Sequence, residues 1–185
     1  SREDYKNKRQ LFNSIADKDD CFFIDEGGSS IEATWGCKEL IHELKQEYNH
    51  IICAAGTGTT AAGLALGIAD KNLNTLLDVI PVLKNGGFIE DEMKILDASI
   101  DNVHLHVDYH FGGYAKTTPL LLEFVKDFVQ ATGIMIEPTY TGKALYALHD
   151  LIQKDFFPKK SKILFVHTGG LTGLLGQLEK FNKVQ

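Results

Sequence analysis

The feature that most constrains the fold is the apolar run at residues 50–55, which ends directly in a loop of glycines and threonines. This loop, made of Gly56, Thr57, Gly58, Thr59 and Thr60, leads into a stretch of alanine, glycine and leucine at residues 61–66. Such a pattern predicts a strand, a tight turn and a small-residue helix that packs closely on a sheet. Backbone N–H groups and the helix dipole at the start of that helix attract an anion, so the loop is a candidate phosphate site.

The same alternation of apolar runs and helical stretches continues along the chain. Strands are expected at residues 21–24, 75–82, 103–107 and 162–167, and helices at 4–18, 90–96, 120–131, 143–153 and after 170. Another helix is expected to begin after Ser30 as its N-cap, and Thr141 is expected to cap the helix at 143–153. Thr118, Pro119 and Gly133 bound the helix at 120–131. Strands separated by helices predict an α/β fold with an open, mainly parallel sheet flanked by helices.

Charge and cysteine content narrow the classes of partner and compartment. The formal net charge is −6, from 19 basic and 25 acidic residues, which argues against nucleic acid or an anionic membrane as a partner. No apolar run approaches the roughly 18 residues that a membrane span requires. The three cysteines show no CxxC spacing, so we expect reduced, mostly buried thiols in a cytoplasmic protein.

Two further glycine turns follow expected strands, at residues 26–29 and 168–170. Ligands in open α/β sheets bind beyond the carboxyl ends of the strands, so the three turns are expected to face one crevice that binds an organic phosphate. Tyr140 and Tyr114 lie in loops that would border this crevice. Alternatively, Tyr140 is a loop tyrosine half-packed against the sheet, and the loop of Tyr114 is simply a long crossover connection.

Other kinds of site fit less well. The loop lacks the Lys-Ser/Thr pair of a P-loop and the third glycine of a dinucleotide fingerprint, and Asp78 lies inside an apolar strand rather than at its end. His104, His106 and His110 suggest metal ligands, but no cluster of cysteines or aspartates supplies a closed set, so no metal is predicted. A serine hydrolase is disfavoured because no G-x-S-x-G motif is present. The glycine–threonine loop could also be a tight turn that binds nothing.

Four motifs in register identify a known family by resemblance. They are Asp25-Glu26-Gly27-Gly28-Ser29, the run from Gly56 to Leu64, Pro138-Thr139-Tyr140-Thr141-Gly142-Lys143-Ala144 and Phe165-Val166-His167-Thr168-Gly169-Gly170. Their order and spacing resemble the 1-aminocyclopropane-1-carboxylate deaminase and D-cysteine desulfhydrase family of fold-type II pyridoxal-phosphate enzymes. The resemblance implies a tryptophan-synthase-β-like sheet, a small amino-acid substrate and pyridoxal 5′-phosphate as cofactor. It also implies that residues 56–60 hold the cofactor phosphate and that Tyr140 and Tyr114 are active-site tyrosines.

The resemblance further bears on the reaction. Family members that open the cyclopropane ring have a glutamate after the matching tyrosine, facing the pyridine nitrogen. Thr141 occupies that position here, and Thr168 is another candidate partner for the nitrogen. A hydroxyl leaves the nitrogen closer to neutral than a carboxylate does. That weaker electron sink favours β-elimination from D-cysteine-like substrates over ring opening.

The family's pattern also includes an N-terminal segment with the Schiff-base lysine, which these residues do not match. Neither Lys116 nor Lys143 occupies its position, so we expect the chain alone to be inactive. Residues 1–25 are expected to be the tail of a smaller domain, residues 26–185 the C-terminal part of the larger cofactor-binding domain, and residue 1 a cut. The missing segment, or self-association as a homodimer, would cover an exposed sheet edge. The alternative is a non-catalytic phosphate-ligand-binding or oligomerisation module.

Overall fold

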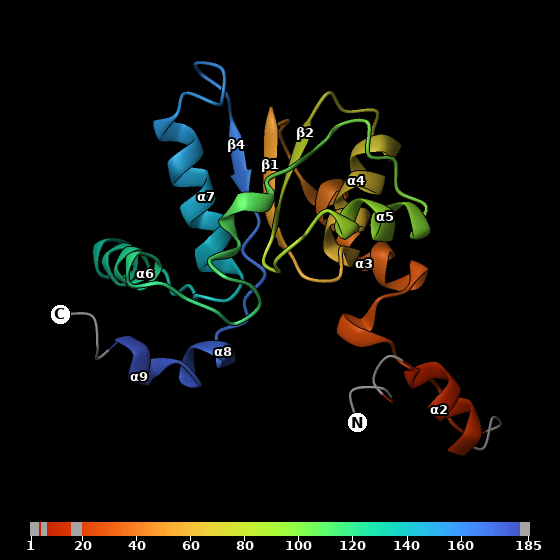
Figure 1. Cartoon of the computed structure of the whole chain (residues 1–185). Coiled ribbons are helices and arrows are strands. Elements are labelled where there is room, and N and C mark those ends of the chain that lie inside the picture. The colour runs from red at the N-terminus through yellow and green to blue at the C-terminus, as the bar shows by residue number, and fades with distance from the viewer. Residues whose placement is uncertain (1–3, 5–6, 16–19, 182–185) are drawn as a thin grey trace.

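The computed structural model describes residues 4, 7–15 and 20–181 (Figure 1). In chain order the elements are α2 (Lys8–Ile15), η1 (Glu26–Gly28), α3 (Ile31–Glu43), β1 (His50–Ala55), α4 (Thr59–Asp70), β2 (Leu76–Pro81), α5 (Phe88–Ile95), β3 (Val103–Leu105), η2 (Val107–His110), α6 (Pro119–Thr132), α7 (Thr141–Gln153), β4 (Ile163–Phe165), α8 (Thr172–Leu175) and α9 (Leu178–Phe181). Within these described ranges, no helix is both long and apolar enough to cross a membrane.

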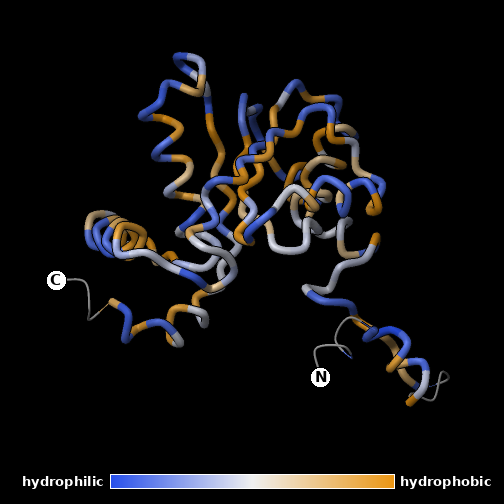
Figure 2. The backbone as a smooth tube through the Cα atoms, in the orientation of Figure 1, coloured by the Kyte–Doolittle hydropathy of each residue, from blue (hydrophilic) through white to orange (hydrophobic). Residues whose placement is uncertain are grey.

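The sheet has the strand order β3-β2-β1-β4, and every pairing is parallel. Helices α3, α4 and α5 lie on one side of it and α7 on the other (Figure 1). The central strands β1 and β2 are buried almost throughout, as expected for strands covered on both faces. Figure 2 shows the apolar residues concentrated in the strands and on the helix faces turned toward them. The predicted parallel α/β fold is therefore confirmed.

The alternation of side chains along the strands produces two cores. Ile51 and Cys53 face α3, α4 and α5, whereas Ile52 and Ala54 face α7. A smaller third cluster lies between α6 and α7. The carboxyl ends of β1 and β2 consequently open between the two helical layers, where the site lies.

Several predicted helix boundaries are confirmed. The Ser30 hydroxyl accepts from the N–H of Ala33, and the Thr118 hydroxyl accepts from the N–H of Leu121, so both act as N-caps. Gly133 ends α6 with a φ of 71°, a backbone conformation that favours glycine.

The strand expected at residues 21–24 is wrong. This segment pairs with no described strand, and Phe22 and Ile24 are 88% and 73% exposed. Its apolar sequence gave the signal of a buried strand, but the segment leads from α2 to η1 outside the sheet. The expectation of mostly buried thiols is also wrong, because only Cys53 is buried, Cys37 is half-buried and Cys21 is exposed.

Three other boundaries differ from expectation. Beyond β3, the chain turns into η2 at Val107 instead of continuing as a strand. The expected final helix is divided into α8 and α9 on either side of Gly176. The expected helix at 4–18 is described as α2, while Tyr5 and residues 16–18 lie outside the described residues.

Candidate functional site

The glycine–threonine loop joins the carboxyl end of β1 to the N-terminus of α4. Gly58 occupies the N-cap position with a φ of 85°, and no side chain of the described residues caps this helix end. The hydroxyl groups of Thr57 and Thr59 lie 3.1 Å apart. The first N–H groups of a twelve-residue helix and two hydroxyls therefore converge at this loop, an arrangement suited to an anion.

The first glycine turn packs directly against this loop. Thr59 Oγ1 donates to Ser29 Oγ over 3.0 Å, which joins the two segments. A Cβ on Gly27 would lie 3.0 Å from Cγ2 of Thr57, so only glycine allows this approach. Two of the three predicted glycine turns thus meet in one place.

The third turn lies elsewhere. Thr168 is exposed, and a Cβ on Gly170 would lie 3.6 Å from Cγ of Glu137. The expectation that all three turns border one crevice therefore stays a prediction for residues 168–170. They face the segment before α7 and do not line the cavity described next.

A cavity of about 700 Å³ opens beside the loop. Its lining residues are Lys8, Asp25, Glu26, Gly27, Ser29, Gly56, Thr57, Leu83, Phe88, Glu92, Tyr114 and Tyr140. Sequence reasoning had selected Gly56, Thr57, Tyr114 and Tyr140 as site residues and missed Phe88 and Glu92. A signal for the last two existed, since Gly86 and Gly87 form another glycine turn after a strand.

Tyr140 lies over Gly56. A Cβ on residue 56 would be 3.1 Å from Cε1 of Tyr140 and 3.3 Å from its hydroxyl oxygen. The Tyr114 ring meets the Tyr140 ring edge-on, with centroids 5.9 Å apart. Burial raises the pKa of Tyr140, and hydrogen bonding to Tyr114 and the negative charge of Glu137 raise it further. The phenol is therefore held in its neutral form beside the glycine–threonine loop.

Glu137 organises the N-terminus of α7, which positions Tyr140. Its carboxylate accepts from the backbone N–H groups of Tyr140 and Thr141 over 2.6 and 2.8 Å, and also from that of Thr139. Thr141 Oγ1 in turn accepts from the N–H of Glu137 over 3.0 Å. Thr141 was expected to cap α7, but it is the first helical residue and the Glu137 carboxylate caps the helix instead. Thr141 is buried and does not line the cavity.

Lys143 fastens the loop that carries Tyr114. Its fully buried Nζ donates to the carbonyl oxygens of Val82, His110 and Gly113 over 3.2, 2.8 and 2.7 Å. Burial lowers the pKa of Lys143 to about 8. Since all three donors are engaged by carbonyls, this ammonium is directed away from the cavity. Lys143 is the third residue of α7, and the sequence around it gave no signal for this role.

Lys116 and Lys8 lie in surroundings that differ from those of the buried Lys143. Lys116 is exposed, whereas Lys8 lines the cavity and forms ion pairs with Asp25 and Glu26. Lys8 was not selected from the sequence, because no local motif surrounds it.

The three histidines considered as metal ligands lie in two different places. Nδ1 of His110 accepts from the N–H of Gly112, in the loop before Tyr114. His104 and His106 instead lie beside Asp78 of the neighbouring strand. The sequence offered no cluster of cysteines or aspartates to complete a set with these histidines, but the fold brings one aspartate to them from β2. Asp78 is fully buried among histidines, so it does not present the free carboxylate of a dinucleotide site.

Comparison with known proteins gives consistent matches. A family model described as pyridoxal-phosphate dependent enzyme matches residues 1–169. A bifunctional D-cysteine desulfhydrase/1-aminocyclopropane-1-carboxylate deaminase of Arabidopsis thaliana is 33% identical, over 97% of this chain and 51% of that protein. A D-cysteine desulfhydrase of Salmonella newport is 31% identical, over 83% of this chain and 51% of its own length. The chain spans about half the length of these curated relatives.

Solved structures agree with these matches. The crystal structure of an ACC deaminase homologue superposes with a TM-score of 0.74 at 29% identity, covering 86% of this chain and 52% of that one. A fungal L-serine ammonia-lyase from Rhizomucor miehei, with a TM-score of 0.58 at 17% identity, covers 81% of this chain and 56% of that one and shares the fold.

Proposed function

Because the chain belongs to the family of pyridoxal-phosphate-dependent enzymes, we propose that residues 56–60 hold the phosphate of pyridoxal phosphate in an enzyme that acts on small amino acids. The observation that carries the proposal is the glycine–threonine loop at the uncapped N-terminus of α4, with the Tyr140 ring directly over Gly56. When bound, this cofactor supplies an electron sink for bonds to the amino acid's α-carbon.

The residues of the cavity fit such a cofactor. Its phosphate requires hydrogen-bond donors, and the first N–H groups of α4 provide them. Its flat ring requires a flat neighbour, and the Tyr140 ring lies next to the loop. Tyr140 and Tyr114 reach the same cavity, where their hydroxyl groups can donate hydrogen bonds to a substrate carboxylate.

We further propose that the whole enzyme favours β-elimination of D-cysteine over opening of the cyclopropane ring. In that reaction D-cysteine and water give pyruvate, hydrogen sulfide and ammonia. The position after Tyr140 is Thr141, which has no charge with which to hold a proton on the pyridine nitrogen. The nearby Glu137 carboxylate is engaged by three backbone N–H groups, so it is not free for that task.

The lysine that binds the cofactor covalently is proposed to belong to the remainder of a longer protein. The relatives are about twice as long as this chain. Lys143 is committed to three carbonyls, and Lys116 is exposed. We therefore expect the 185-residue chain to show no turnover by itself.

The reaction preference is tested on the whole protein. With pyridoxal phosphate present, pyruvate release from D-cysteine is expected to exceed 2-oxobutanoate release from 1-aminocyclopropane-1-carboxylate. Thr141→Glu is expected to shift the ratio of the two kcat/KM values toward ring opening by about tenfold or more, equivalent to about 1.4 kcal/mol. Thr141→Ser, which keeps the hydroxyl, should leave the ratio unchanged. A wild-type protein that prefers the cyclopropane substrate would refute the proposed reaction.

The lysine assignment has a separate test. Borohydride reduction of the loaded whole protein fixes the cofactor to the lysine that holds it, and peptide mapping identifies that residue. We expect a labelled peptide outside these 185 residues. Label on Lys8, Lys116 or Lys143 would show that the lysine is in this chain. No cofactor bound by the whole protein would leave the phosphate-ligand-binding module as the better account.

A further inference from the structure

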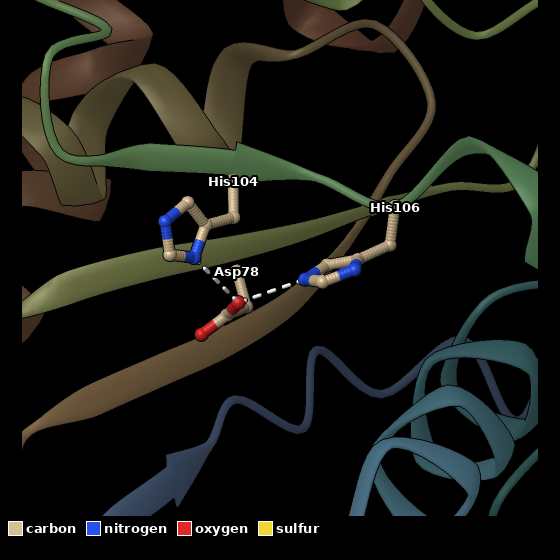
Figure 3. Close-up of side chains that lie close together, drawn as sticks. All are labelled: Asp78, His104 and His106. Carbon is tan, nitrogen blue, oxygen red and sulfur yellow. Dashed lines mark hydrogen bonds and ion pairs between the residues drawn. The ribbon is translucent and has the colours of Figure 1, made fainter. Parts of the chain in front are cut away.

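A second cluster of chemically active side chains lies away from the cofactor cavity, on the α7 side of the sheet. Asp78 is the third residue of β2, and His104 pairs with it in register on the edge strand β3. His106 follows two residues later and points to the same face (Figure 3). The cavity lies at the carboxyl ends of the strands, so this cluster is a separate site.

From this cluster we propose that Asp78, His104 and His106 form a binding site for a divalent transition-metal ion, zinc in the first instance. Two imidazoles and one carboxylate are ligands that zinc accepts, and a solvent molecule completes such a set. The pairing of β2 with β3 fixes the backbones that carry them.

The distances between the ligand atoms suit a small ion. Nε2 of His106 lies 2.8 Å and Nδ1 of His104 lies 3.4 Å from Oδ1 of Asp78. All three ligand atoms lie within 4.8 Å of one another. Two ligands bonded to zinc at about 2.0–2.1 Å in tetrahedral geometry are about 3.3 Å apart. Small rotations of the two imidazole rings therefore suffice to enclose the ion.

Nδ1 of His104 is also a nitrogen in need of a partner. The atom is buried, yet it makes no hydrogen bond among the described residues. Its 3.4 Å contact with Oδ1 of Asp78 lacks hydrogen-bond geometry, so the buried nitrogen is left unsatisfied, and a metal ion would satisfy it. The remainder of the His104 side chain is 43% exposed, which leaves a path for an ion and its water.

A second layer of residues holds the carboxylate in place. Nδ1 of His50 lies 2.8 Å from Oδ2 of Asp78, which leaves Oδ1 turned toward His104 and His106. The Phe156 ring, 5.1 Å from that of His106, shields the site on one side.

Binding of a metal ion at these three residues would connect strands β2 and β3. Strand β3 comprises only three residues at the edge of the sheet, so a metal bridge from His104 and His106 to Asp78 would fasten it to β2. A ligand that binds only the folded state stabilises that state. Zinc is therefore expected to raise the Tm of the chain.

The test uses the 185-residue chain without a polyhistidine tag, stripped of metal with a chelator. Calorimetric titration with zinc chloride is expected to give one ion per chain, and cobalt(II) is expected to give visible bands of a four-coordinate site. His104→Ala and His106→Ala should each weaken zinc binding by about tenfold or more, and His50→Ala should weaken it by about tenfold. The double variant His104→Ala/His106→Ala should lose the zinc-dependent rise in Tm.

His42→Ala is the matched control, because His42 lies 3.7 Å from a carboxylate of Asp70 without a second histidine beside it. Its zinc affinity should equal that of the wild-type chain. The proposal is overturned if the wild-type chain binds no zinc at one ion per chain. It is equally overturned if the double variant binds zinc as tightly as the wild type does. The wild-type titration decides the first point whether or not the variants fold.

Discussion

At the residue scale, the position of the Tyr140 ring beside the cavity depends on the absence of a Cβ at residue 56. Gly56 has no Cβ, so the Tyr140 ring can lie over the glycine–threonine loop, and the Glu137 carboxylate accepts a hydrogen bond from the backbone N–H of Tyr140. Gly56 and Tyr140 could be selected from the sequence as candidate site residues because both lie beside recognisable turns. It could not find Glu137 or Lys143, because their roles arise from partners that the local sequence does not show.

Gly56→Ala is expected to weaken binding of pyridoxal phosphate by about tenfold. The added methyl would lie 3.1 Å from the Tyr140 ring, so the ring must move, and overpacking of this kind costs about 1–3 kcal/mol. Fluorescence titration of the whole protein measures the affinity. Gly36→Ala, where nothing lies within 4 Å, is the control and should bind as the wild type does. Equal affinities of the Gly56 variant and the wild type would contradict the assigned position of Tyr140.

Lys143 predicts a pH dependence of stability. Its pKa falls from 10.5 to about 8 on folding, so between these values the unfolded chain binds more protons than the folded one. The free energy of unfolding of the wild type, relative to Lys143→Met, should therefore rise as the pH increases from 8 toward 10.5. Urea unfolding of both proteins at several pH values measures the difference. A constant difference across that window would mean that folding does not perturb this lysine.

At the element scale, the position of α4, the helix that follows the glycine–threonine loop, is fixed by close contact with α3. A Cβ on Gly63 would lie 2.4 Å from Cβ of Cys37 and 2.5 Å from the carbonyl oxygen of Thr34. The small residues of α4 had predicted close packing on a sheet, and the sheet does contact this helix. The closest approach, however, is to another helix, which composition alone does not distinguish.

Gly63→Ala is accordingly expected to destabilise the chain by about 1–3 kcal/mol, since backbone atoms must move to admit the methyl group. Gly36→Ala, on the partner helix α3, should instead stabilise it by up to about 1 kcal/mol through helix propensity. Urea unfolding midpoints of the two variants compare them directly. Similar effects from both substitutions would contradict the close α3–α4 contact.

Helix ends were predicted correctly where interactions within a few residues determine them. The N-caps Ser30 and Thr118 and the terminating Gly133 each act through hydrogen bonds or backbone conformation within a few residues. The strand expected at residues 21–24 failed because a strand requires a neighbour, and this segment has none in the described sheet. An apolar run shows only that side chains favour burial, not that a partner is available.

At the scale of the whole molecule, the strand order determines which distant residues meet. Asp78 lies next to His104 because β2 and β3 pair, and the loop at residues 56–60 meets Ser29 because α3 and α4 pack together. The sequence indicates a parallel sheet but not its order, so the strand–turn–helix at residues 50–66 was predictable and the Asp78 cluster was not. The edge strands β3 and β4 support the proposal that the remaining half of a longer protein, or a second copy, pairs with this sheet.

The central claim is that residues 56–60 bind the phosphate of pyridoxal phosphate, and amide chemical shifts of the isotopically labelled chain test it most directly. On titration with the cofactor, the largest changes are expected at the amides of Gly56 through Thr60, saturating at one molecule per chain. Pyridoxal, which lacks the phosphate, should produce much smaller changes at these amides. Equal changes with both compounds, or changes concentrated elsewhere in the chain, would contradict the account.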